Sequence, residues 1–89
     1  MRKQKNKIAG SVREIDFSGL HAPCIAVYRN PEDFPGKSVA RVYDMDRPTD
    51  VVIVRENPIE IAADIRKYTS MKFIPRTKED VSALIGVWI

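Results

Sequence analysis

The chain has 89 residues, of which 44% are hydrophobic and 30% are charged. Two domains of about 40 residues each would be too small to bury a stable core without metal or disulfide support, so the length predicts one domain and excludes most multidomain enzymes. No apolar run exceeds five residues. A membrane-spanning helix needs about 20, so helical membrane proteins are excluded as well.

Basic residues are concentrated near the N-terminus. Residues 1–13 carry five bases and no acid, whereas residues 14–89 carry ten bases and twelve acids. The formal net charge of +3 therefore comes from the first segment, and we expect a basic N-terminal arm at 1–13 followed by a single domain at 14–89. Such an arm either lies in solvent or makes an auxiliary electrostatic contact. Its bases are Arg2, Lys3, Lys5, Lys7 and Arg13.

Cysteine usage and the N-terminal residues bear on the compartment. Cys24 is the single cysteine, so no disulfide can form within the chain. The N-terminus lacks the apolar stretch of a secretory signal. We therefore expect a cytoplasmic protein without membrane association.

The first third of the chain contains one clear strand. Residues 7–17 mix helical spacing with β-branched residues and Gly10, which predicts a short strand or a turn. An irregular piece around His21 follows. Cys24–Arg29 is a short apolar, β-branched run that ends just before Pro31, a pattern typical of a β-strand.

Two further strands are expected before residue 57. Pro35 and Gly36 fit the central positions of a type II turn, and the strand Ser38–Asp44 follows directly. After a turn-forming connection, the strand Val51–Glu56 begins with four β-branched residues, which indicates burial on both faces. The short connections predict an antiparallel meander. The residues that favour a turn in the second connection are Asp46, Pro48, Thr49 and Asp50.

Residues 57–68 predict the main helix. Asn57 is a good N-cap, Pro58 fits the first helical position, and Glu60 is placed so that its carboxylate reaches back to the cap amide. Apolar residues recur at helical spacing and give the helix a stripe for packing on the sheet. These residues are Ile61, Ile65 and Tyr68.

Two short strands complete the expected fold. Met71–Ile74 has the composition of a strand ended by proline, and Leu84–Ile89 alternates weakly. We expect Trp88 and Ile89 to be packed, because exposing either side chain would forfeit roughly 2 kcal/mol. The sequence therefore predicts an α+β fold with a single antiparallel sheet, in the order β-β-β-α-β-β, and one main helix packed on one face.

Three patterns resemble catalytic or ligand-binding motifs without completing them. His21 and Cys24 are too few for a zinc site and lack the cleft that Cys–His catalysis needs, so a small enzyme using them is kept only as a third hypothesis. Residues 36–38 match the end of a phosphate-binding loop, but Pro31 occupies the position of its first glycine. The aspartates between the second and third strands lack the glycine and glutamate of a calcium loop. We therefore expect no metal, no cofactor and no catalysis.

Arginines of the expected sheet form the more informative polar set. By strand parity we expect three arginines to lie on one sheet face beside Tyr43. Basic, aromatic sheet faces stack single-stranded nucleic acid in several modules. The alternative is that the arginines pair with acids across a solvent-exposed face. The arginines are Arg29, Arg41 and Arg55, and the acids are Asp33, Asp44 and Glu56.

A resemblance to known proteins covers residues 24–89. It rests on the segment 28–37 (Tyr-Arg-Asn-Pro-Glu-Asp-Phe-Pro-Gly-Lys), on Val39-Ala40-Arg41, Asp46 and Pro48-Thr49, and on the ending Val87-Trp88-Ile89. These residues are similar to those of a group of small uncharacterised proteins of Gram-positive bacteria and their phages and mobile elements. The resemblance implies a stand-alone bacterial domain and brings no known activity or site residues. Small proteins in that setting often bind a host or rival protein, as anti-CRISPR inhibitors do.

The sequence therefore favours a non-enzymatic interaction module that binds a protein or nucleoprotein partner, as a phage- or mobile-element-encoded inhibitor of host defence. The alternative is a nucleic-acid-binding accessory protein, with the arm on phosphates and the arginine face on bases. An open sheet edge would also allow a homodimer by strand pairing. The expected partner-contact residues are Arg29, Arg41, Tyr43, Asp44, Asp46, Arg47, Asp50 and Arg55, and those of the alternative are Arg2, Lys3, Lys5, Lys7 and Arg13.

Overall fold

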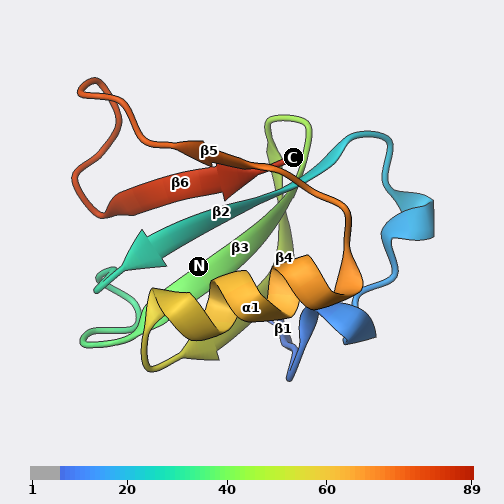
Figure 1. The fold of residues 1–89 in the computed structure, drawn as a ribbon, viewed down its shortest axis with the longest axis horizontal. Helices are drawn as coiled ribbons and strands as arrows, with labels where there is room; N and C mark the ends of the chain where they lie inside the picture. The colour runs from blue at the N-terminus through green and yellow to red at the C-terminus, as the bar shows by residue number, and fades with distance from the viewer. Residues whose placement is uncertain (1–6) are drawn as a thin grey trace, which may run out of the picture.

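The computed structural model describes residues 7–89, which fold into a six-stranded sheet with one α-helix packed on it (Figure 1). The predicted α+β class is confirmed. Arg2, Lys3 and Lys5 of the expected arm lie outside the described residues. In chain order the elements are β1 (Lys7–Ile8), the 3₁₀ turns η1 (Val12–Glu14) and η2 (Phe17–Gly19), β2 (Pro23–Arg29), β3 (Ser38–Asp44), β4 (Arg47–Arg55), α1 (Pro58–Tyr68), β5 (Phe73–Pro75) and β6 (Leu84–Trp88).

The strands lie in the order β1-β4-β3-β2-β6-β5. Neighbours are antiparallel except β1, which runs parallel to β4 with Lys7 opposite Val51. The prediction of a purely antiparallel sheet was therefore wrong, and the sheet is mixed. The reason is the path of residues 9–22, which leave the sheet edge, cross the helix-bearing side through η1 and η2, and return at the centre as β2 (Figure 1). A two-residue strand is too short to give a periodic signal.

Aliphatic side chains between the sheet and α1 form the core. Strand alternation directs one set of residues from β2, β3 and β4 toward the helix. Ile61 and Ile65 of the predicted stripe meet them and are fully buried, whereas Tyr68 is exposed at the end of α1. The sheet residues of this core are Ile25, Val27, Ala40, Val42, Ile53 and Trp88.

The helix begins as the sequence predicts. The side chain of Asn57 accepts from the Glu60 N–H at 3.1 Å, and Pro58 is the first helical residue. The Glu60 carboxylate bonds the side-chain amide of Asn57 at 3.0 Å rather than the backbone amide. At the other end, the Thr69 hydroxyl donates to the Ile65 carbonyl at 2.8 Å. Each end of α1 therefore has a side-chain partner for one of its free backbone groups.

The predicted type II turn between β2 and β3 is confirmed. Gly36 has φ of +79°, the left-handed value that the third position of a type II turn requires. The Lys37 N–H donates to the Phe34 carbonyl at 3.2 Å and closes the turn.

The connection between β3 and β4 is shorter than predicted. Only Met45 and Asp46 form the turn, and β4 begins at Arg47. Pro48 is tolerated in this strand because β1 joins β4 only at Val51, so the proline lies on an open edge where no neighbouring strand of the described chain needs its N–H. Pro48, Thr49 and Asp50, which we expected in a turn, therefore belong to an edge strand.

The C-terminal end of the described chain is packed through Trp88 alone. Trp88 is 4% exposed. Its ring centroid lies 5.2 Å from that of Phe73 and 5.3 Å from the guanidinium carbon of Arg66. Ile89 is 56% exposed, so the expectation that it is packed was wrong. Its N–H donates to the Lys72 carbonyl at 2.9 Å, which shows that the backbone rather than the side chain fixes this residue.

The start of η1 is fastened to α1. The Ser11 hydroxyl donates to Asp64 Oδ1 at 2.9 Å, and the Val12 N–H donates to Asp64 Oδ2 at 2.7 Å. Val12 is buried in the core. Lys7 in β1 and Arg13 in η1, both counted in the expected arm, thus lie in folded segments.

Candidate protein-interaction surface

The cross-strand register decides which polar residues share a side of the sheet. Residues directly opposite one another in neighbouring strands point the same way. Ser38 lies opposite both Arg29 and Arg55, so these two arginines share the helix-bearing side. Arg41 lies three residues after Ser38 in β3, so it shares the opposite side of the sheet with Tyr43. The prediction that all three arginines lie beside Tyr43 was wrong, because parity within a strand does not fix the register between strands.

Tyr28 lies on the same side as Arg41 and Tyr43 and was not singled out from the sequence. Its hydroxyl is 3.3 Å from the Tyr43 hydroxyl. In β2, Ala26 lies between Tyr28 and Cys24, and Cys24 is the cross-strand partner of Tyr43. The rings of Tyr28 and Tyr43 therefore approach each other over Ala26, which is buried. The alternation of β2 could have placed Tyr28 on this side, but its contact with Tyr43 depends on the register.

Arg41 forms an ion pair with Asp33 on the same side. The Arg41 side chain is only 24% exposed. It lies opposite Ala26 and Val52, so its aliphatic stem covers these small buried residues. This pair belongs to the alternative interpretation, in which strand arginines pair with acids. We call the surface formed by Tyr28, Asp33, Arg41 and Tyr43 the tyrosine face.

The tyrosine face is electrically neutral at physiological pH. Burial, followed by the hydrogen bond with Tyr43, raises the pKa of Tyr28 to about 12. The hydroxyl of Tyr28 therefore stays protonated, and the charge of Arg41 is matched by that of Asp33. The face can lose its water without leaving an unpaired charge behind.

The β3–β4 hairpin ends in a turn with strained backbone. Met45 has φ of +62°, and the residue is 67% exposed. The left-handed region disfavours such a side chain by roughly 1–2 kcal/mol, and two-residue hairpin turns usually place glycine, asparagine or aspartate there. The chain thus holds a large apolar side chain at an exposed tip despite the strain.

Asp44 fixes the backbone of this tip. Its carboxylate accepts from the N–H groups of His21 at 2.9 Å and Ala22 at 2.8 Å, and the Met45 N–H donates to the Ala22 carbonyl at 2.8 Å. The hydrogen bond from Ala22, with further help from His21, lowers the pKa of Asp44. We call Asp44–Arg47 the hairpin tip. Asp46, Arg47 and the nearby Asp50 are exposed.

The other two expected contact residues have different surroundings. Arg55 donates to the carbonyls of Gly10 and Val54, so it fastens the N-terminal segment to β4. Arg29 is exposed on the helix-bearing side, away from the tyrosine face. Over residues 7–89 the chain carries twelve bases and twelve acids. The described chain therefore has no net basic charge.

His21 and Cys24 lie near the hairpin tip. The His21 side chain is 89% exposed, with Nδ1 3.6 Å from Asp44. The Cys24 thiol contacts the Met45 carbonyl at 3.7 Å, and burial raises its pKa, which favours the unreactive thiol over the thiolate. Within residues 7–89, no three His, Cys, Asp or Glu side chains are grouped so as to hold a metal ion.

Comparisons with known proteins do not assign the chain. No family model matches it, and no curated protein or solved structure is significantly similar. The resemblance to small proteins of Gram-positive bacteria therefore stays a prediction. Among the described residues, no helix has the length and apolar character needed to cross a membrane.

Proposed function

We propose that the protein is a non-enzymatic binding module that contacts a protein partner through the tyrosine face and the hairpin tip. The observation that supports this most directly is the pairing on the tyrosine face, where Arg41 is neutralised by Asp33 and two tyrosine hydroxyls lie 3.3 Å apart. Tyrosine and arginine are enriched at protein interfaces, where they contribute most when desolvated and paired.

The hairpin tip supplies a protruding apolar anchor beside this face. Met45 is exposed, and the hydrogen bonds of Asp44 and Ala22 hold its backbone in place. A preorganised anchor loses little conformational entropy on binding, and a methionine side chain adapts to the shape of a partner pocket. The tip is therefore suited to insert into an apolar hollow.

The setting of the partner follows from the resemblance to proteins of phages and mobile elements. A binding module without catalytic groups acts by occupying a surface of its partner. We therefore propose that it inhibits a host-defence protein or nucleoprotein in the bacterial cytoplasm. This step rests on analogy of size and setting rather than on a motif.

Homodimerisation by strand pairing stays a prediction. The open edges of the described sheet are formed by β1 with the first half of β4, and by β5. Each contains a proline, Pro48 or Pro75, which cannot donate to an intermolecular ladder. Any pairing between copies is therefore limited to a few hydrogen bonds.

The test is affinity capture on the immobilised full chain from lysates of Gram-positive bacteria. Arg41→Glu and Met45→Asp should each lower the amount of captured partner at least about tenfold, as for contacts near the centre of an interface. Ile59→Asp is the matched control, because Ile59 is 78% exposed on α1, away from the proposed surface. Circular dichroism checks that each variant is folded. Undiminished capture by both surface variants would show that the surface is wrong.

Nucleic-acid binding is the competing proposal. The full chain and a variant with Arg2, Lys3 and Lys5 changed to glutamine are titrated into labelled single-stranded DNA and RNA. Removal of residues 1–13 is avoided, because Val12 is part of the core. Tight binding whose dependence on salt decreases in the variant would favour a nucleic-acid function, since each lost phosphate contact lowers the salt slope by about one.

A further inference from the structure

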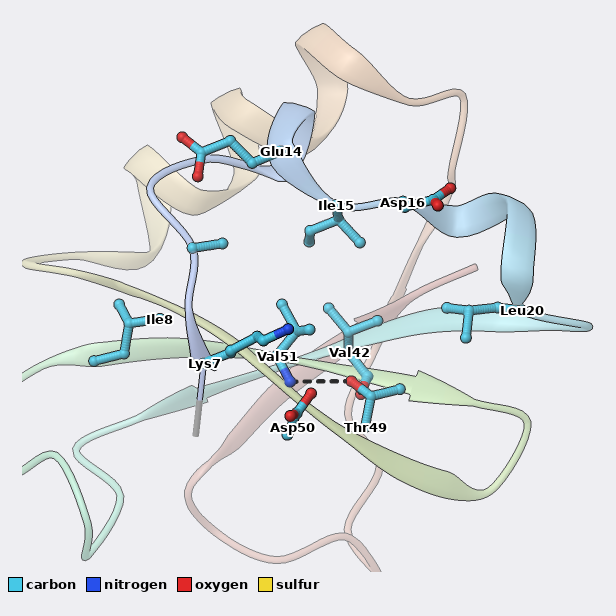
Figure 2. A pocket seen from close by; sticks show the side chains of 11 residues that line it. Lys7, Ile8, Glu14, Ile15, Asp16, Leu20, Val42, Thr49, Asp50 and Val51 are labelled. Atoms are coloured by element: carbon cyan, nitrogen blue, oxygen red, sulfur yellow. Dashed lines mark hydrogen bonds between the residues drawn. The ribbon is translucent and has the colours of Figure 1, made fainter. Parts of the chain in front are cut away.

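A pocket of about 510 Å³ opens on the helix-bearing side of the sheet, beside β1 (Figure 2). Residues 14–20 form its roof, and β1, β3 and β4 form the remaining walls. This volume lies within the range of small-molecule sites. The pocket is on the other side of the sheet from the tyrosine face, so an occupant would leave the proposed partner surface free.

The inner surface of the pocket is largely aliphatic. Ile15 and Leu20 extend from the roof, and Val42 and Val51 extend from the sheet (Figure 2). All four are buried or half-buried and belong to the core or pack against it. A ligand with an apolar body would therefore replace water against these side chains.

Most polar side chains of the lining already have partners. The Glu14 carboxylate accepts from the Gly10 N–H at 3.0 Å. Asp16 accepts from the Ser18 N–H at 3.0 Å, and the Thr49 hydroxyl donates to a β3 carbonyl at 2.8 Å. These hydrogen bonds fix the side chains in the pocket wall and use part of the acceptor capacity of the two carboxylates, which stay charged.

The two remaining charged groups of the lining point in different directions. Asp50 precedes Val51 in β4, so its side chain faces the other side of the strand, and Figure 2 shows its carboxylate away from Ile15 and Leu20. Lys7 is exposed, and its side chain points from β1 toward Val51 at the rim of the pocket (Figure 2). In the 7–89 range, no ion pair or hydrogen bond joins the Lys7 ammonium to another residue.

We propose that this pocket binds an apolar monocarboxylate, such as a medium-chain fatty acid. The carboxylate pairs with the Lys7 ammonium, and the hydrocarbon chain lies against the four aliphatic side chains. One negative charge matches the Lys7 ammonium, which is the one base that residues 7–89 contribute to the lining. The lining also carries the carboxylates of Glu14, Asp16 and Asp50, which repel any anion and repel a doubly charged phosphate more strongly than a monocarboxylate.

The test is an NMR titration of the full-length protein with octanoate and octylammonium, below the concentrations at which either forms micelles. The two probes have the same chain length and opposite head-group charge. Octanoate should shift the amide signals of Ile15, Leu20 and Val51 in a saturable way and bind at least about tenfold more tightly than octylammonium.

Three variants locate the effect. Lys7→Met should abolish the preference for octanoate, and Lys7→Arg should keep it. Arg13→Met is the matched control, because Arg13 is an exposed base of η1 that does not line the pocket. Equal affinity for the two probes, absence of saturable shifts, or an unchanged preference in Lys7→Met would overturn the proposal.

Discussion

The two sides of the sheet are built from different chemistry. The helix-bearing side is an aliphatic core in which residues such as Ile53 and Ile65 are excluded from water. On the other side, small buried residues are covered by Tyr28, Arg41 and Tyr43, whose polar ends pair with one another or with Asp33. On our proposal, most of the stability comes from the aliphatic side and partner recognition from the other side. Substitutions on the two sides should therefore have separable effects.

The largest effect on stability should come from the helix-bearing side. Ile65→Ala leaves a cavity in the core and should lower the free energy of unfolding by about 2–5 kcal/mol. Urea denaturation measures it. Ile59→Ala, on the exposed surface of the same helix, should change stability by less than about 0.5 kcal/mol. If Ile65→Ala does not fold, Ile65→Val should still lose about 0.5–1.5 kcal/mol. Equal effects at positions 59 and 65 would contradict the assignment of the core.

A smaller effect should come from the tyrosine face. Tyr43→Phe removes the hydroxyl that pairs with Tyr28 and should lower the free energy of unfolding by about 0.5–1.5 kcal/mol. It should also lower the pKa of Tyr28 from its value of about 12. Absorbance titration of tyrosine ionisation measures this shift, with Tyr68→Phe on the exposed end of α1 as the control.

The raised pKa of Tyr28 also sets a pH dependence. Its folded pKa of about 12 lies above the ordinary value of 10.0, so the fold favours the neutral hydroxyl. This contribution to stability is fully present below pH 10 and is lost as the pH rises toward 12. The loss should be shallower in Tyr43→Phe than in the wild type. Identical alkaline stability curves would show that the two hydroxyls are not coupled.

Met45→Gly should separate stability from binding most clearly. Glycine adopts the left-handed backbone freely, so the variant should be as stable as the wild type or more stable by up to about 1 kcal/mol. Capture of the partner should nevertheless decrease, because the apolar anchor is gone. Thermal unfolding and affinity capture are measured on the same sample. A less stable variant with unchanged capture would mean that Met45 serves folding rather than binding.

The smallest effect concerns Asp44. Hydrogen bonds from Ala22 and His21 hold its pKa below the ordinary value of 3.8, so its contribution to stability is present above that value and is lost as the pH falls through the lower folded pKa. Asp44→Asn keeps an acceptor oxygen but cannot titrate. The difference in stability between the wild type and this variant should therefore shrink in acid, as followed by circular dichroism. A difference that is constant with pH would rule out the ionised carboxylate as the stabilising group.

Features with a local cause were predictable from the sequence. Asn57 and Pro58 mark the start of α1 through their own backbone preferences, and Gly36 marks the turn before β3. Features that depend on distant pairing were not. The two residues of β1 carry no periodic signal, and Pro48 signals a turn although an open edge accommodates it in β4.

The candidate site shows the same division. Arg41 and Tyr43 could be selected because both lie in a strand with clear alternation. The contact of Tyr28 with Tyr43, and the separation of Arg29 and Arg55 from them, follow from the register of β2, β3 and β4, which one sequence does not contain. The positive φ of Met45 is likewise hidden, since methionine is not a residue that marks left-handed backbone.

The central claim is that the tyrosine face and the hairpin tip form the contact surface. Site-specific photocrosslinking tests it most directly, with a benzophenone amino acid placed at Met45 or, as the control, at Ile59. Our account expects a covalent adduct with one partner from position 45, competed away by excess unlabelled protein, and none from position 59. An adduct from position 59 alone, or from both positions with equal yield, would contradict it.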